Sequence, residues 1–287
     1  MLRGMDLLPQ ELITRLVRAA LAEDVGSGDV TTLATVPEHA TARAAMMARE
    51  ELVVCGLALA AAAFKEVSPE VLVQCFAQDG ARLQRGEKLL EVSGPARALL
   101  TGERVALNLV QRLSGVATVA ARFAEAVRGT NAVILDTRKT TPGWRELEKY
   151  AVRCGGARNH RAGLWDMVLI KDNHLAALRE ATPNAIAAAV QRARENFPEL
   201  KVEVEADTLA QVAQAADAGA DIILLDNMAL EELREAVRVV GGRAQTEASG
   251  GVNLQTVRGI AETGVDFISV GAMTHSARAV DIGLDFF

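Results

Sequence analysis

This 287-residue sequence has few aromatic residues, and it lacks long apolar runs and an excess of positive charge. Aromatic side chains make up only 3% of it, too few for the stacking platforms that bind single-stranded nucleic acids. The formal net charge of -6 argues against a general nucleic-acid binder, because neutralising phosphates requires a net basic face. No run reaches the ~18 apolar residues of a membrane span. Neither nucleic acid nor a membrane is therefore an expected partner.

Cysteine is also scarce. Cys55, Cys75 and Cys154 are far apart and odd in number, which argues against a disulfide framework. No Cys or His pair has zinc-binding spacing, so a zinc site is not expected. The first 24 residues carry charges among their apolar positions and lack the apolar core of a signal peptide. A reducing, cytoplasmic location is expected.

The first part of the chain has a mixed α+β pattern. Apolar residues at helical spacing predict an amphipathic helix over residues 10–22. Short alternating runs over residues 42–92 predict strands around one helix at 58–66. After a break at Pro95, a long helical region is expected, with an interruption near Gly115.

After Asn131, short β-rich runs alternate with helix-like segments. The last four of the six runs begin 20, 23 and 22 residues apart, which is typical of βα units with parallel strands. The runs cover residues 132–136, 167–171, 201–206, 221–226, 244–249 and 266–271, and helices are expected at 184–196, 208–218, 230–240 and 254–263. The series predicts a parallel sheet, for which a closed barrel is the natural form at this strand count.

Polar residues or glycines end each of these runs. In a βα barrel, the carboxyl ends of the strands meet at one rim, where the loops build the active site. We therefore expect one site to contain the residues at these ends, which are Asp136, Lys171, Glu205, Asp226, Ser249 with Gly250 and Gly251, and Gly271.

Positive charge is concentrated in one segment of this acidic chain. The segment from Asp136 to His174 holds eight Arg or Lys residues against five Asp or Glu. Any single arginine could be an ordinary surface charge, but guanidinium and ammonium groups that converge at one rim bind carboxylates and phosphates. The basic set predicts a polyanionic ligand and consists of Arg104, Arg138, Lys139, His160, Arg161 and Lys171.

Two carboxylates at strand ends suggest a second role. Glu203 and Glu205 project to the same side of one predicted strand. They can pair with lysines of the barrel; alternatively, Glu205 and Asp226 can ligate a magnesium-bound sugar phosphate or stabilise positive charge on a ribosyl carbon. Lys171 could instead be the imine-forming lysine of a barrel lyase. A non-catalytic anion-binding protein is the third possibility.

Glycines indicate where a phosphate would bind. Gly250, Gly251 and Gly271 end the last two runs, and glycine turns that lead into helices present backbone N–H groups to a monophosphate. There is no Walker A sequence, and the glycines at 26 and 28 lack the third glycine of a dinucleotide fingerprint.

Motifs along nearly the whole chain resemble the carboxylating nicotinate-nucleotide pyrophosphorylases, also called quinolinate phosphoribosyltransferases. The motifs are EDVGSGDVTT, ERVALNLVQRLSGVAT, DTRKTTPGWRELEKYAVRCGGARNHR, LIKDNH, EVE, LLDN, SGG and GAMTHSARAVDIGLDF. The resemblance implies a type II phosphoribosyltransferase-like α/β fold. Residues 1–116 would form an N-terminal α/β sandwich domain to which 276–287 return, and residues 117–275 would form an incomplete (β/α) barrel.

The resemblance also implies an activity. The family transfers phosphoribosyl from phosphoribosyl pyrophosphate to quinolinate with loss of CO₂, and gives nicotinate mononucleotide and pyrophosphate in de novo NAD biosynthesis. The expected cofactor is Mg²⁺, bound mainly through the substrate, with Glu205 and Asp226 as candidate ligands. Related enzymes that use nicotinate share the architecture, so nicotinate stays open as an acceptor.

Site residues follow from the matching motif positions. The expected catalytic residues are Lys139, Lys171, Glu205 and Asp226. The expected quinolinate pocket contains Arg104, Arg138, Lys139, His160 and Arg161; the 5-phosphate would contact Ser249, Gly250, Gly251, Gly271 and Ala272; and Thr137 and Val270 complete the substrate-binding set. Arg104 is expected to reach the neighbouring subunit's site, which implies a homodimer, with higher homo-oligomers open.

Overall fold

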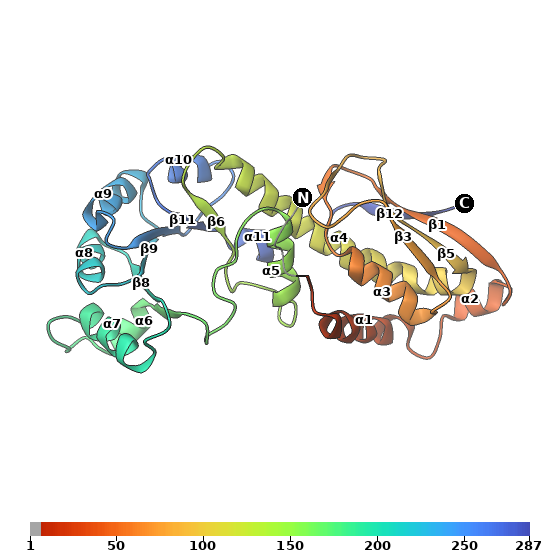
Figure 1. Cartoon of the computed structure of the whole chain (residues 1–287), viewed down its shortest axis with the longest axis horizontal. Helices are drawn as coiled ribbons and strands as arrows, with labels where there is room; N and C mark the ends of the chain where they lie inside the picture. The colour runs from red at the N-terminus through yellow and green to blue at the C-terminus, as the bar shows by residue number, and fades with distance from the viewer. Residues whose placement is uncertain (1–6) are drawn as a thin grey trace. The chain divides into compact units, whose positions relative to one another are not determined.

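Two compact units make up the chain. The computed structural model describes residues 7–287 (Figure 1). The first unit contains the residues up to Ala121 together with Glu146–Gly156 and Ala277–Phe287. The second contains Arg122–Arg145 and Ala157–Ser276. Each unit draws its core from segments that are distant in the sequence.

An antiparallel sheet forms the centre of the first unit. Its strand order is β12-β1-β5-β3, so the C-terminal strand β12 (Ile282–Phe286) pairs with β1 (Thr41–Ala48), and β1 pairs in turn with β5 (Lys88–Pro95). The other strands are β3 (Leu72–Cys75) and the two-stranded pair β2 (Leu52–Val53) and β4 (Arg82–Leu83). The helices are α1 (Gln10–Val25), α2 (Val30–Thr35), α3 (Leu57–Val67), α4 (Ala96–Ala126) and α5 (Arg145–Cys154).

The helix predicted at residues 10–22 is confirmed as α1. Its apolar stripe, which includes Leu12, Ile13 and Val17, is buried, and α1 packs against α3. An additional helix, α2, starts inside the polar segment that follows, because the side chain of Asp29 accepts a hydrogen bond from the N–H of Thr32 at 3.0 Å. A cap of this kind satisfies an N–H group that would otherwise lack a partner at the helix start.

The interruption expected near Gly115 is wrong, because α4 runs unbroken for 31 residues. The glycine serves a packing contact instead: a Cβ at this position would overlap the backbone carbonyl of Arg278. Tertiary packing therefore outweighs the low helix propensity of glycine. Although α4 is long, none of the helices within residues 7–287 has the combination of length and apolarity needed to cross a membrane.

A parallel sheet of six strands forms the second unit. Its order is β6-β11-β10-β9-β8-β7, and α7, α8 and α9 pack against it (Figure 1). The strands are β6 (Val133–Leu135), β7 (Val168–Ile170), β8 (Val202–Ala206), β9 (Ile222–Asp226), β10 (Gln245–Ser249) and β11 (Phe267–Ser269). The helices are α6 (Asp172–Ala176), α7 (Ala185–Asn196), α8 (Leu209–Asp217), α9 (Leu230–Val240), α10 (Val257–Ala261) and α11 (Ala272–His275). All six predicted strands and the four predicted helices are confirmed.

The barrel is incomplete. Among residues 7–287, β6 and β7 are the two edge strands of the sheet and do not pair with each other. The closed barrel expected from the strand count is therefore wrong, and the incomplete barrel implied by the resemblance is confirmed. The stretch between β6 and β7 contains α5, which belongs to the first unit and adds no strand to this sheet. Six strands fall short of the eight whose interior side chains just fill a closed barrel.

We expect Gly115→Ala to lower the free energy of unfolding by about 2 kcal/mol, measured by urea denaturation. Forcing a methyl group to within 2.0 Å of a backbone carbonyl costs about 3 kcal/mol, and the roughly 1 kcal/mol that alanine gains in a helix leaves a net loss of about 2 kcal/mol. Gly259→Ala in α10 is the matched control, because its Cβ would meet only the side chain of Leu230, at 3.4 Å. Equal stability of the two variants would contradict the close contact.

Candidate active site

A cavity of about 490 Å³ opens at the carboxyl ends of the strands of the second unit. Its volume lies within the range of sites for small organic ligands, about 300–1,000 Å³. The residues that line it are Thr137, Arg138, Lys139, His160, Arg161, Leu169, Lys171, Glu205, Asp226, Asn227, Glu247, Ser249, Gly250, Gly251 and Ser269. The structure thus brings together side chains from positions 137 to 269 at one edge of the sheet.

Most residues singled out from the sequence line this cavity, but Asp136, Glu203 and four further residues do not. Arg104 belongs to the first unit, where it is exposed on α4. Val270 is buried and donates its N–H to the carbonyl of Leu135 at 2.9 Å. Gly271 and Ala272 follow at the start of α11, and a Cβ on Gly271 would lie 3.1 Å from the Lys139 side chain. Gly271 is therefore close to a lining residue, and neither Gly271 nor Ala272 lines the cavity itself.

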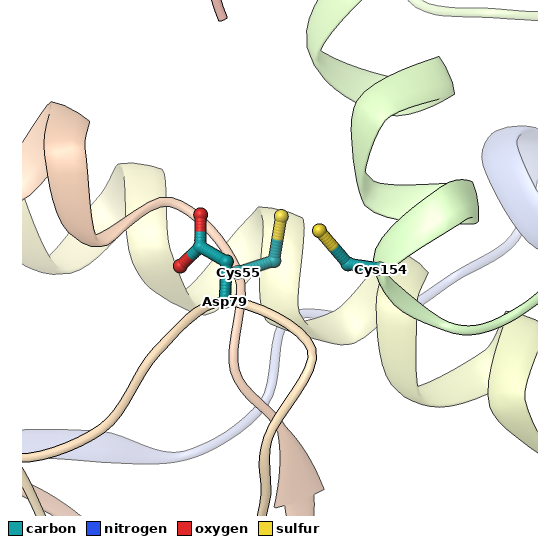
Figure 2. A group of neighbouring side chains, drawn as sticks. All are labelled: Cys55, Asp79 and Cys154. Atoms are coloured by element: carbon teal, nitrogen blue, oxygen red, sulfur yellow. The ribbon is translucent and has the colours of Figure 1, made fainter. Parts of the chain in front are cut away.

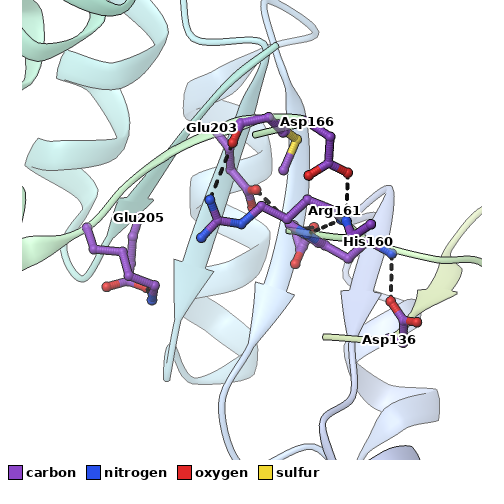
Figure 3. Close-up of polar contacts among 10 residues, drawn as sticks. Asp136, His160, Arg161, Asp166, Glu203 and Glu205 are labelled. Carbon is purple, nitrogen blue, oxygen red and sulfur yellow. Dashed lines mark hydrogen bonds and ion pairs between the residues drawn. The ribbon is translucent and has the colours of Figure 1, made fainter. Parts of the chain in front are cut away.

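The loop that carries His160 and Arg161 is attached to β6. Arg158 extends the edge of this strand, accepting from the N–H of Asp136 at 3.1 Å and donating to the carbonyl of Ile134 at 2.9 Å. The fully buried carboxylate of Asp136 then accepts the His160 N–H at 2.7 Å and the Asn159 side-chain N–H at 2.8 Å (Figure 3). Asp136 is thus a support of the loop and does not line the cavity.

Two guanidinium groups give the cavity its strongest positive charge. The Nε of Arg138 is buried and has no hydrogen-bond partner among the described residues. Burial and the neighbouring charge of Arg138 lower the pKa of Arg161, whose guanidinium donates to the Met167 carbonyl at 3.3 Å. A buried N–H donor without a partner is costly, and repulsion between two like charges adds to that cost. An anionic ligand would relieve both.

Carboxylates stand beside these cations. Lys171 forms an ion pair with Glu205, and Asp226 accepts a hydrogen bond from the side chain of Asn227 at 2.6 Å. The pairing of Glu205 with a lysine agrees with one of the two alternatives considered from the sequence. It does not exclude the other, because Glu205 and Asp226 both remain on the cavity wall.

The glycine turn after β10 is shaped by a close approach. Gly250 has a φ of +94°, and a Cβ there would overlap the side chain of Asn227. Asn227 itself adopts a φ of 54° and donates its backbone N–H to the Ser249 carbonyl at 2.9 Å. The exposed Gly250 and Gly251 donate no N–H hydrogen bond to any other residue in the range 7–287. Their backbone donors are therefore available to an anion.

His160 lies against two buried glutamates in the cavity floor. Its Nε2 is 3.0 Å from Oε2 of Glu203 (Figure 3). The same atom is 3.4 Å from Oε2 of Glu247. Burial alone would lower the pKa of His160, but these two carboxylates outweigh burial and raise it to about 10. Burial, with the charge of Glu247, also raises the pKa of Glu203. Because both pKa values are raised, the three groups near neutral pH hold one proton more than a neutral imidazole and two ionised carboxylates would hold.

Hydrogen-bond geometry indicates where that proton resides. The Nδ1 of His160 accepts the backbone N–H of Arg161 at 2.8 Å, so Nδ1 carries no proton and the ring has its single N–H on Nε2. The two carboxylates would favour a doubly protonated His160 ring. In such a ring, however, the Nδ1–H would point at the backbone N–H of Arg161. The three groups therefore hold the extra proton as one coupled unit, which loses it with the raised pKa of about 10. The same geometry disfavours metal binding here, because Nε2 has no free lone pair.

Four lining residues are not singled out by the sequence, namely Leu169, Asn227, Glu247 and Ser269. Glu247 had a usable signal, since it lies two residues before Ser249 and so faces the same side of β10. The signal for Asn227 was weak, because it directly follows Asp226 in the loop after β9. Leu169 and Ser269 had the same positional signal, since they lie two residues before Lys171 and Gly271, but neither carries a charge that would have singled it out.

A second cavity, of about 550 Å³, lies at the amino ends of β9 and β10. Arg243 is the only cation that lines it, and its guanidinium already contacts Asp217 and the carbonyls of Val239 and Val240. Because the positive charge of Arg243 already has partners, this second cavity has no unpartnered cationic group among the described residues to attract an anion, in contrast to the first cavity.

Comparisons with known proteins agree with the geometry. Residues 29–114 and 116–285 match the quinolinate phosphoribosyl transferase N-terminal and C-terminal domains. Nicotinate-nucleotide pyrophosphorylase (carboxylating) of Mycobacterium leprae (strain TN) is 47% identical over 277 residues, which cover 94% of this chain and 95% of that protein. A chloroplastic protein of the same name from Arabidopsis thaliana is 43% identical and covers 94% of this chain and 81% of its own. The solved nicotinate-nucleotide pyrophosphorylase of Francisella tularensis has a TM-score of 0.92 at 38% identity, with 99% of each chain covered.

The fold and the cavity define an α/β protein with an anion-receptive site at the carboxyl edge of an open parallel barrel. Both domains of one family are matched in order, and close relatives align over nearly the whole chain. The chain therefore belongs to the quinolinate phosphoribosyl transferase family, and the resemblance seen in its motifs is confirmed.

The proton held by the His160 cluster predicts a pH-dependent stability. The pKa of His160 is about 10 in the folded state against 6.5 in the unfolded chain, so this contribution is fully present below pH 6.5 and is lost as the pH rises towards 10. We expect the free energy of unfolding to fall between pH 7 and 10 by up to about 1.4 kcal/mol per pH unit. Glu247→Gln removes one carboxylate of the cluster and should flatten this slope.

Urea denaturation at pH 7, 8, 9 and 10 measures this slope. Glu199→Gln is the control, because Glu199 is an exposed glutamate outside the cavity. The same slope in Glu247→Gln and Glu199→Gln would show that the cluster does not hold the proton.

Proposed function

We propose that this protein transfers the phosphoribosyl group of phosphoribosyl pyrophosphate to quinolinate and releases CO₂ and pyrophosphate. The product, nicotinate mononucleotide, would enter NAD biosynthesis. The observation that carries the proposal is a single cavity in which two arginines and two lysines face two strand-end carboxylates. Relatives at 43% and 47% identity carry names for this reaction.

Quinolinate fits the cationic side of the cavity. It is a planar pyridine with two adjacent carboxylates, and guanidinium groups bind planar carboxylates through paired hydrogen bonds. The buried Nε of Arg138 supplies a donor without a partner, and burial together with the neighbouring charge of Arg138 lowers the pKa of Arg161. A dicarboxylate would satisfy the donor and neutralise the charge in one binding event.

Phosphoribosyl pyrophosphate fits the opposite side. The pyridine nitrogen would displace pyrophosphate from ribosyl C1 while positive charge develops on that carbon, and Glu205 and Asp226 are the carboxylates placed to stabilise it. Lys171 and Lys139 would hold the departing pyrophosphate. The open N–H groups of Gly250 and Gly251 would take the 5-phosphate.

Magnesium agrees with this donor set. Mg²⁺ prefers oxygen ligands and commonly binds one or two carboxylates together with substrate phosphates, and Glu205 and Asp226 supply such oxygens at the rim. When bound, the ion would neutralise charge on the pyrophosphate. The arginines and lysines of the cavity orient the two anionic substrates without its help.

Decarboxylation follows from the charge on the ring. Once the pyridine nitrogen is bonded to C1 of the ribose, it is positively charged and stabilises the electron pair left at C2 when CO₂ departs. A proton then takes the place of the carboxylate. The cavity's part is to hold the ring in position through Arg138 and Arg161 until this step is complete.

The barrel lyase is the main alternative. It requires the Nζ of Lys171 to attack a carbonyl carbon, whereas this atom already forms an ion pair with Glu205. Borohydride would trap an imine on Lys171 if the lyase reaction occurred. The non-catalytic alternative predicts that both anions bind without any turnover.

Assembly and location complete the proposal. We propose a homodimer in which the exposed Arg104 on α4 reaches the partner's cavity, in line with the resemblance, and a cytoplasmic location. We also propose the domain limits implied by the resemblance, which are 1–116 with 276–287 and 117–275.

Incubation with quinolinate, phosphoribosyl pyrophosphate and Mg²⁺ should release CO₂ and pyrophosphate in equal amounts. Carboxyl-labelled quinolinate measures the CO₂, and chromatography measures the mononucleotide. A chelator should suppress the rate, because the charge of pyrophosphate would no longer be neutralised. Faster turnover with nicotinate, which loses no CO₂, would overturn the assignment of quinolinate.

Arg138→Ala should weaken quinolinate binding by about 2–5 kcal/mol, because a buried carboxylate would lose its charged partner. Isothermal titration calorimetry measures this affinity directly. Arg192→Ala, which removes an exposed arginine of α7, is the matched control and should bind quinolinate like the unaltered protein. Unchanged affinity in Arg138→Ala would remove the central support for the proposed function.

A further inference from the structure

A group of metal-ligating side chains lies in the first unit. Cys55 follows β2, Asp79 lies between β3 and β4, and Cys154 ends α5 (Figure 2). The two sulfur atoms and one carboxylate oxygen all lie within 4.8 Å of one another. Cys55 is fully buried and Cys154 is 4% exposed. Their positions are 99 residues apart in the sequence, so no spacing motif could reveal this arrangement.

The carboxylate of Asp79 is held in a defined orientation. Its Oδ1 accepts the N–H groups of Gly56 and Leu57 at 3.0 and 3.1 Å, at the start of α3. Its Oδ2 accepts the hydroxyl of Tyr150 at 2.8 Å. A carboxylate oxygen has two lone pairs, so Oδ2 keeps one for a further partner. Supporting hydrogen bonds of this kind typically orient metal-ligating carboxylates.

We propose that Cys55, Asp79 and Cys154 bind a thiophilic divalent cation of the Zn²⁺ type. A tetrahedral zinc ion with Zn–S bonds of about 2.3 Å places two sulfur ligands roughly 3.8 Å apart, within the observed limit for this group. Two thiols and one carboxylate are a donor set that Zn²⁺ accepts. A water molecule would take the fourth position.

The carboxylate favours a cation over a disulfide. Oxidation of a thiol proceeds through the thiolate, and a neighbouring negative charge disfavours that form. The same charge stabilises a bound cation. On binding, the two thiols would release two protons and become thiolate ligands, which leaves the two sulfurs, the carboxylate and the divalent ion with one net negative charge.

The ion would join two parts of the first unit. One part is the segment from Cys55 to Leu57, where α3 begins, and the other is the C-terminal end of α5. A cation bound only in the folded state stabilises that state in proportion to its free concentration. The site shares no residue with the substrate cavity, so this inference stands or falls independently of the proposed reaction.

The test uses the full chain, freed of metal by a chelator and kept reduced with a phosphine. Co²⁺ serves as the spectroscopic probe, because thiolate ligands give a charge-transfer band that oxygen ligands do not. We expect one Co²⁺ per chain with this band, displacement of Co²⁺ by Zn²⁺, and a higher melting temperature with Zn²⁺. Cys75→Ser is the matched control, since Cys75 is the exposed cysteine on β3.

The variants separate ligation from adventitious binding. Cys75→Ser should keep the band, Cys154→Ser should lose it, and Asp79→Asn should weaken Zn²⁺ binding. The band in the unaltered protein reports ligation even if a variant fails to fold. Absence of the band in the folded unaltered protein, or its loss in Cys75→Ser but not in Cys154→Ser, would overturn the proposal. A Cys55–Cys154 disulfide in protein prepared without reductant, together with no metal uptake after reduction, would also overturn it.

Discussion

The buried carboxylate of Asp136 is the interaction on which the geometry of the cavity depends. It accepts N–H groups from Asn159 and His160, while Arg158 continues the edge of β6. These bonds hold a segment without regular secondary structure against a strand end, and they set the position of Arg161. Catalytic and binding groups are typically carried in this way, on loops that a rigid scaffold positions.

Holding Arg138 near Arg161 has an electrostatic cost. Burial and the charge of Arg138 both lower the pKa of Arg161, whereas the charge of Glu203 acts in the opposite direction. Glu203 therefore supplies part of the countercharge to the cationic pair. This explains why a locally basic cavity and two fully buried carboxylates occur together in one barrel.

The two units differ in how they use ionisable groups. In the second unit, the buried Nε of Arg138 has no hydrogen-bond partner among the described residues and so favours binding of an anion. In the first unit the charges are reversed. There, two sulfur atoms and a carboxylate oxygen, from Cys55, Cys154 and Asp79, lie close together and are suited to bind a cation. An anion in the cavity and a cation at the cysteine group can bind independently, because the two sites share no residue.

Local patterns in the sequence determined the helices and strands of this protein, and tertiary contacts decided which distant residues come together. Strand and helix periodicity depend on neighbouring residues, so the six runs after Asn131 and their helices could be read directly, and the strand-end rule placed Lys171, Glu205 and Asp226 at one rim. Long-range contacts leave no such periodic trace. Only the fold shows that Gly115 lies against the Arg278 carbonyl, that the barrel stays open, that Glu247 reaches His160, and that Cys55 meets Cys154, because each depends on a partner far away in the chain.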